Sequence, residues 1–168
     1  LEYRGYDSAG VALYADGEVQ VTRSIGKLSE LKRVLEQRDN KLEAHVGIGH
    51  TRWATHGRPS ENNAHPHTAG RVSLIHNGIV ENYLEIRERL ERAGSVFHSE
   101  TDTEIAAHLL NRNLEYGMEP LKALEATCKE IRGSYAFVAM DAKRPNSLLI
   151  AKNATPIVVG LGDKEVFV

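Results

Sequence analysis

The dipeptide Asp16-Gly17 separates two strand-like runs near the start of the chain, and it limits the fold more than any other feature. Residues 10–15 are small or apolar, and residues 18–24 alternate, with Val19 and Val21 on one side. An Asp-Gly pair between such runs favours a two-residue hairpin, which joins antiparallel strands. The chain is therefore expected to begin with an antiparallel pair rather than with a βαβ unit.

The remaining pattern consists of strands, then helices, then strands again. Strand-like runs cover residues 44–52, 72–75 and 96–98, and later residues 135–140, 147–151, 156–160 and 166–168. Helical spacing covers residues 28–35, 83–90, 105–112 and 121–131, with Gly94 as a C′ glycine and Leu121, Leu124, Cys128 and Ile131 as one inward face. With hairpin-length links late in the chain, this order predicts an α+β fold with largely antiparallel sheets.

Composition excludes several classes of protein. The 168 residues can form one domain with a real core, and the net charge of -2 without a basic block gives no sign of nucleic-acid binding. No apolar run approaches the ~20 residues of a membrane span, and no signal peptide is apparent. A single cysteine fits a reducing compartment, so we expect a cytoplasmic protein. The abrupt ends at Leu1 and Val168 suggest a fragment truncated at both ends.

The segment 49–59 is the first candidate for ligand binding. It follows an apolar run, is closed by Gly57 and Pro59, and carries Arg52, Trp53, Thr55 and His56. A guanidinium at a strand end can hold a carboxylate with two hydrogen bonds. Asp102 lies in Thr101-Asp102-Thr103-Glu104, which matches a capping box at a helix start, although Asp102 could instead bind an ammonium group. Arg52 and Asp102 together would recognise both charged ends of an α-amino acid.

Asn77-Gly78, at the predicted end of the 72–75 strand, has two interpretations. Taken alone, the pair favours a hairpin turn. Alternatively, the Asn77 amide and the Gly78 backbone N–H could stabilise a developing oxyanion, an interaction worth ~3 kcal/mol in a transition state.

No nucleophile accompanies these groups. The spacing of Cys128 on its predicted helix favours a small core residue, and no serine lies in a Gly-x-Ser-x-Gly elbow. Six of the eight histidines fall between His45 and His76, but their spacing lacks the usual pattern of a zinc site. A histidine metal site is therefore an alternative, and histidines that hydrogen-bond within loops are the better interpretation.

Five ordered blocks resemble the glutaminase domains of the glucosamine-6-phosphate synthase family, which are class II glutamine amidotransferases. The resemblance runs from Leu1 to about Gly162, and amidophosphoribosyltransferase and asparagine synthetase share its general plan. The blocks are Tyr3-Arg4-Gly5-Tyr6-Asp7-Ser8-Ala9-Gly10, the 49–57 loop, Asn63-Ala64-His65-Pro66-His67, His76-Asn77-Gly78-Ile79-Val80-Glu81-Asn82 and Ser99-Glu100-Thr101-Asp102-Thr103-Glu104.

The resemblance implies a four-layer αββα sandwich of the N-terminal-nucleophile hydrolases and a partial type 2 amidotransferase domain over residues 1–168. It implies an N-terminal cysteine that attacks glutamine with its own amino group as base. That cysteine would lie upstream of Leu1, so the fragment should be inactive alone. It also implies the following roles: Asn77 and Gly78 in the oxyanion hole, Arg52 on the carboxylate, Asp102 on the ammonium, Trp53, Thr55 and His56 in a closing loop, Arg4 near the nucleophile, and His65 beside the pocket.

The partners implied are glutamine or glutamate and a C-terminal sugar-phosphate isomerase domain that binds fructose 6-phosphate. A homo-oligomer is expected at full length, with no cofactor, no metal, no nucleic acid and no membrane. Two other functions remain open. One is a glutamine- or glutamate-binding module without chemistry, and the other is the amidotransferase domain of another class II enzyme such as amidophosphoribosyltransferase.

Overall fold

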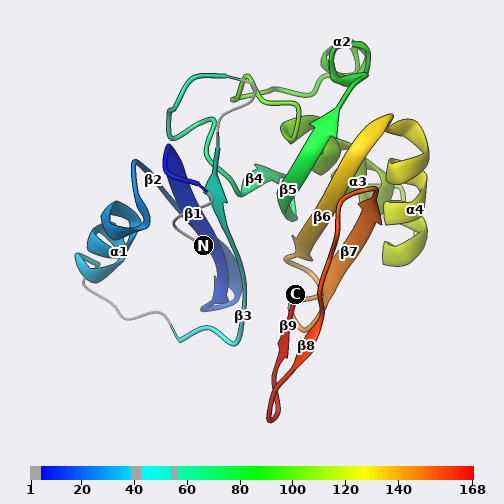
Figure 1. Ribbon diagram of the computed structural model, residues 1–168. Coiled ribbons are helices and arrows are strands. Elements are labelled where there is room, and N and C mark those ends of the chain that lie inside the picture. Colours follow the sequence, from blue (N-terminus) through cyan, green and yellow to red (C-terminus); the bar gives the residue numbers. More distant parts are fainter. Residues whose placement is uncertain (1–4, 39–42, 54–56) are drawn as a thin grey trace.

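A computed structural model describes residues 5–38, 43–53 and 57–168. Within these ranges a three-stranded antiparallel sheet has the order β2-β1-β3. Its strands are β1 (Ser8–Ala15), β2 (Glu18–Ile25) and β3 (Val46–Arg52), and helix α1 (Leu28–Glu36) lies on its outer side (Figure 1). At the β1–β2 turn, Asp16 and Gly17 both have positive φ, 54° and 86°, as a primed hairpin turn requires. The predicted hairpin is confirmed.

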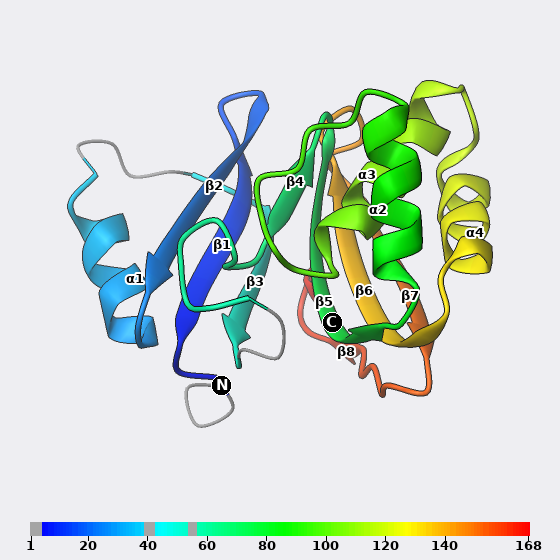
Figure 2. The same cartoon turned by 90° about the horizontal axis from the view of Figure 1, so that it is seen from above.

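A four-stranded antiparallel sheet with the order β4-β5-β6-β7 faces the first one. Three helices cover its outer side, so that the layers run helix, sheet, sheet, helices (Figure 2). The predicted α+β, αββα architecture is confirmed. These elements are β4 (His67–Ala69), β5 (Val72–Val80), β6 (Gly133–Asp141), β7 (Leu148–Asn153), α2 (Tyr83–Arg92), α3 (Glu104–Glu115) and α4 (Pro120–Glu130).

The main hydrophobic core lies between the second sheet and its helices. Phe137 and Leu74 from the sheet are fully buried there with Ile105 and Leu109 of α3. A smaller cluster around Ala12, Ile48 and Met140 joins the two sheets. The second sheet and its helices therefore hold most of the buried apolar side chains in the described residues, and the space between the sheets holds fewer.

Strand β5 differs from the prediction in a way that matters for function. It runs through Asn77 and Gly78, which pair with Ala136 and Tyr135 of β6. The hairpin-turn interpretation of Asn77-Gly78 is therefore wrong, because cross-strand pairing with a distant segment extends β5 beyond the predicted 72–75.

The predicted capping box is also wrong. Helix α3 begins at Glu104, and Thr103 in the N-cap position makes no side-chain cap bond. The Glu104 carboxylate instead accepts the backbone N–H groups of His98 and Ser99 and the Ser99 hydroxyl. It thereby holds residues 98–99 as a loop, which is why the short strand predicted at 96–98 does not form.

Other elements differ from the prediction in smaller ways. Leu121 is 71% exposed, because the inward face of α4 is built from Pro120, Ala123, Leu124 and Thr127 instead. The predicted strand at 156–160 reduces to β8 (Gly160–Leu161), which pairs with β9 (Val166–Phe167), and β4 was not predicted.

Gly94 does follow α2 with φ 96°, which confirms the C′ glycine. No helix in the described part of the chain is long and apolar enough to cross a membrane.

Candidate functional site

A cavity of about 200 Å³ lies between the two sheets. Four segments that are far apart in the sequence line it. Arg52 comes from the end of β3, Asn77 and Gly78 from β5, Asp102 from the loop before α3, and His65 from the loop before β4. The fold therefore brings together the described residues that the sequence suggested for binding a polar ligand.

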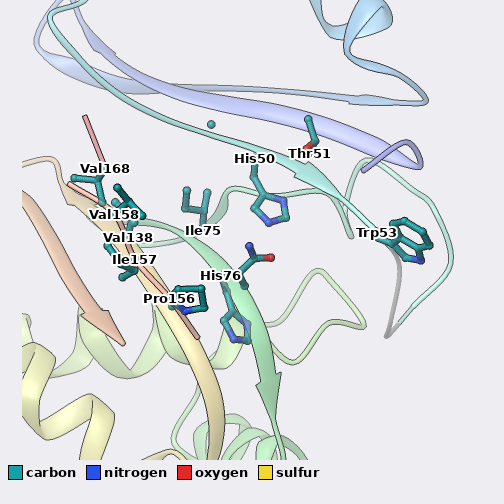
Figure 3. A pocket seen from close by; sticks show the side chains of 13 residues that line it. His50, Thr51, Trp53, Ile75, His76, Val138, Pro156, Ile157, Val158 and Val168 are labelled. Atoms are coloured by element: carbon teal, nitrogen blue, oxygen red, sulfur yellow. The ribbon is translucent and has the colours of Figure 1, made fainter. Parts of the chain in front are cut away.

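A larger opening of about 620 Å³ adjoins this cavity and shares some of its wall (Figure 3). Its walls are mostly apolar, from Ile75 and Val138 in the second sheet and from Val158 and Val168 near the end of the chain. His50 and His76 border both spaces, as do Thr51, Trp53 and Asn77. Asn77 therefore lines both the small polar cavity and the larger opening.

The Arg52 guanidinium forms one wall of the small cavity, and only 4% of the residue is exposed. Its Nη2 donates to the Gly57 carbonyl over 2.8 Å, and its Nη1 lies 3.5 Å from the Asp7 carboxylate. These contacts fix the plane of the guanidinium. A buried cation held in one orientation can bind a carboxylate in a defined pose.

The Asp102 carboxylate lies outside α3, so it is not part of the first turn of that helix. It is buried, and its Oδ2 accepts the Val80 backbone N–H over 2.7 Å. This bond joins the loop before α3 to the end of β5, two residues beyond Gly78. The cavity thus contains a fixed negative group as well as the Arg52 cation.

Gly78 has φ 138°, a value that side-chain-bearing residues rarely adopt. A Cβ at this position would lie 2.1 Å from the Ser134 carbonyl oxygen on β6. Both facts require glycine here whether or not a ligand is bound. Asn77 and Gly78 are nevertheless exposed within β5, and both line the cavity.

Four histidines pack together at the cavity: His50, His65 and His76 line it, and His67 packs against His65. The ring centroids of His50 and His65 are 4.2 Å apart, and those of His65 and His67 are 4.8 Å apart. Burial lowers the pKa of His50 to about 4 and that of His67 to about 3, and it also lowers the pKa values of His65 and His76. These rings are therefore neutral at pH 7. Among the described residues no group of His, Cys, Asp and Glu is arranged to hold a metal ion.

The remaining sequence candidates are a set outside the described residues, one residue at the rim, and one residue away from the site. Arg4, Thr55 and His56 fall outside the described residues. Trp53 is 60% exposed at the rim, where its ring meets that of Tyr6 edge-on at 5.3 Å. Cys128 is on α4, partly buried against the main core, and burial raises the pKa of its thiol. It lines neither the polar cavity nor the apolar opening.

Three residues that line the cavity, His76, Thr101 and Thr103, were neither site candidates nor part of the 49–59 segment. His76 also borders the larger opening. In the sequence, Thr101 and Thr103 were assigned to a capping box, and His76 was one of several loop histidines. The one available signal was that each is adjacent in sequence to a candidate, Asp102 or Asn77.

Two facing antiparallel sheets lie between helical layers, with a polar cavity between the sheets, and solved structures of class II glutamine amidotransferases show that this is the N-terminal-nucleophile hydrolase fold. Two solved structures share this fold. A glutamine phosphoribosylpyrophosphate amidotransferase from B. subtilis, complexed with ADP and GMP, is 27% identical with a TM-score of 0.68, over 84% of this chain and 30% of that one. A structure described as the allosteric regulatory enzyme of purine biosynthesis is 28% identical with a TM-score of 0.70, over 91% of this chain and 32% of that one.

Residues 50–168 match the model of the glutamine amidotransferase domain family, and the chain belongs to this family. Curated relatives include two proteins named glutamine–fructose-6-phosphate aminotransferase [isomerizing]. The protein from Aquifex aeolicus (strain VF5) is 50% identical over 99% of this chain. The protein from Gluconobacter oxydans (strain 621H) is 52% identical, again over 99% of this chain. The chain spans 28% and 27% of the lengths of these relatives.

Proposed function

We propose that this chain is the glutamine-hydrolysing part of an isomerising glutamine–fructose-6-phosphate aminotransferase. One observation carries the proposal. A single small cavity contains a buried cation, Arg52, a buried carboxylate, Asp102, and the Asn77-Gly78 pair. Free glutamine has a carboxylate and an ammonium at one end and an amide at the other, so this set of groups matches its polar ends.

In the proposed mechanism, Arg52 binds the α-carboxylate and Asp102 the α-ammonium. The side-chain carbonyl then lies against Asn77 and Gly78. A cysteine thiol, activated by the amino group of the same residue, attacks this carbonyl carbon. The carbonyl oxygen becomes negative and is stabilised by the Asn77 amide and the Gly78 N–H. Ammonia leaves, a glutamyl thioester remains, and water hydrolyses it to glutamate.

The thiol in this mechanism does not come from these 168 residues, because Cys128 is their single cysteine and lies on α4 away from the cavity. We assign residues 1–168 to a partial type 2 amidotransferase domain that is inactive without the nucleophile. Arg4 would lie near that nucleophile, and Trp53, Thr55 and His56 would form the closing loop. His65 would lie beside the pocket.

The ammonia is used, in this proposal, by a sugar-phosphate isomerase domain of the same polypeptide, which converts fructose 6-phosphate to glucosamine 6-phosphate. We expect the full-length protein to be a cytoplasmic homo-oligomer. The degree of similarity favours this enzyme over an amidophosphoribosyltransferase, since the relatives named above are 50% and 52% identical and the phosphoribosylpyrophosphate amidotransferase is 27% identical.

The test is glutamine hydrolysis by the full-length protein, with Asn77→Ala compared with wild type. Loss of one oxyanion donor should lower kcat ~100-fold or more. Asn146→Ala, an exposed asparagine in the β6–β7 turn, is the matched control and should keep wild-type kcat. An Asn77→Ala enzyme at full rate would remove the oxyanion role. A full-length wild type that binds glutamine without hydrolysing it would favour the binding module.

A further inference from the structure

One buried hydroxyl, that of Thr103, connects three of the polar side chains that line the cavity. Only 1% of Thr103 is exposed. Its Oγ1 lies 3.1 Å from His65 Nε2, 3.0 Å from His76 Nδ1 and 3.5 Å from Asp102 Oδ1. The three partners belong to three segments, namely the loop before β4, strand β5 and the loop before α3.

The hydrogen-bonding capacity of these groups restricts where the protons can be. A hydroxyl donates one hydrogen and accepts two, and an ionised carboxylate can only accept. If Thr103 donates to Asp102, both imidazoles must donate to Thr103. His65 then carries its proton on Nε2 and His76 on Nδ1.

The other ring nitrogens agree with this assignment. His65 Nδ1 and His76 Nε2 are buried and have no well-aligned hydrogen-bond partner in the described part of the chain. In the opposite tautomers these atoms would be buried N–H groups without a good acceptor, an arrangement that proteins rarely tolerate. The backbone of Ser134, near the His76 ring, is the neighbour that could compete for its proton.

We propose that Thr103 is a positioning residue for the amino-acid site. Its hydroxyl accepts the N–H groups of His65 and His76 and donates its own proton to Asp102. The Asp102 carboxylate is thereby held from two sides, by Thr103 at Oδ1 and by the Val80 N–H at Oδ2. This assignment rests on the proposed function in one respect, that Asp102 binds the ammonium group of glutamine.

An interaction that orients Asp102 strengthens the binding of glutamine equally in the bound substrate and in the transition state. Its loss should therefore raise KM and leave kcat nearly unchanged. A purely structural role of Thr103 would lower the amount of folded enzyme without this separation of the two constants.

The experiment uses the full-length protein and compares Thr103→Val, Thr103→Ser and wild type. Thr103→Val keeps the side-chain shape without the hydroxyl, and we expect its KM for glutamine to rise ~10-fold or more. Thr103→Ser restores the hydroxyl and should return KM close to wild type. Thr127→Val, a buried threonine on α4 that bonds Ala123 and Asn113, is the matched control and should leave KM unchanged.

A second measurement reads the protons directly in the wild type. Nitrogen-15 shifts of labelled histidines, assigned by subtracting spectra of His65→Gln and His76→Gln, should show Nε2–H for His65 and Nδ1–H for His76. A wild-type KM in Thr103→Val, or a His76 proton on Nε2 facing Ser134, would overturn the proposal. If Thr103→Val does not fold, these spectra decide. If the wild type does not hydrolyse glutamine, the proposed function fails while the spectra still test the hydroxyl's bonds.

Discussion

At the scale of single residues, Gly78 shows how one position serves both the backbone and the site. Its φ of 138° occurs in the part of β5 that lines the cavity. The absence of a side chain also lets the Ser134 carbonyl of β6 approach. Glycine is therefore required by the strand pairing that builds the proposed oxyanion hole.

Gly78→Ala should destabilise the protein by ~2–4 kcal/mol, because the new Cβ adds a steric clash to the strained backbone. Gly94→Ala is the matched control. Gly94 also has positive φ, but nothing lies within 4 Å of its added Cβ, so it should cost only the backbone strain of ~1–2 kcal/mol. Urea unfolding measures both. Equal costs would show that the Ser134 contact relaxes freely.

At the scale of elements, α4 anchors the outer helical layer through a different face from the predicted one. Leu124 is 4% exposed and belongs to the main core, whereas Leu121 is 71% exposed. Both leucines fit an apolar helical stripe, so spacing alone could not separate them. The direction in which α4 docks against α3 decides which leucine is buried.

Leu124→Ala should lower the free energy of unfolding by ~2–5 kcal/mol through lost burial and a cavity. Leu121→Ala should stay within ~0.5 kcal/mol of wild type, because an exposed side chain loses little on truncation. Thermal or urea unfolding of the two variants tests this. A Leu121→Ala variant as unstable as Leu124→Ala would mean that α4 docks through another face.

At the scale of the whole molecule, the seam between the two sheets concentrates buried histidines close to the site. Burial keeps them neutral, so the charges on Arg52 and Asp102 dominate the cavity at pH 7. The same arrangement makes the folded state less stable in acid, because histidines of the unfolded chain bind protons at pH values at which the buried rings stay neutral.

The pKa shifts determine whether stability rises or falls with pH. The pKa of His67 falls from 6.5 to about 3 on folding, and that of His50 from 6.5 to about 4. Between these values the unfolded state binds more protons, so stability is lost as pH falls below 6.5. Each such ring contributes up to ~1.4 kcal/mol per pH unit. Burial alone would raise the pKa of Glu104, but hydrogen bonds from Ser99 and His98 and the His108 ring 3.9 Å away lower it from 4.5 to about 2, which extends the loss of stability below pH 4.5.

Urea unfolding at a series of pH values between 4.5 and 6.5 tests this prediction. His67→Gln should flatten the pH dependence by ~1 kcal/mol per unit, because it removes one buried titrating ring. His45→Gln, at an exposed position, should keep the wild-type slope. Identical slopes in all three proteins would contradict the assignment of acid lability to the seam.

The sequence by itself determined the features that depend on neighbouring residues. Asp16-Gly17 specifies its turn because both residues tolerate positive φ, and Gly94 ends α2 for the same reason. The order of strands and helices was enough for an antiparallel α+β fold. Arg52, Asn77, Gly78 and Asp102 were recognisable as candidates because their chemistry is visible in the residue types and in the ordered blocks around them.

Only the tertiary structure decided what these residues contact. β5 continues through Asn77-Gly78 because β6, from a distant part of the chain, pairs with it. Glu104 accepts the backbone N–H groups of residues 98–99 instead of forming the expected capping box, and the Thr103 hydroxyl contacts His65 and His76. Such contacts join segments whose separation in sequence carries no signal, so their energies appear only once the sheets and helices have packed.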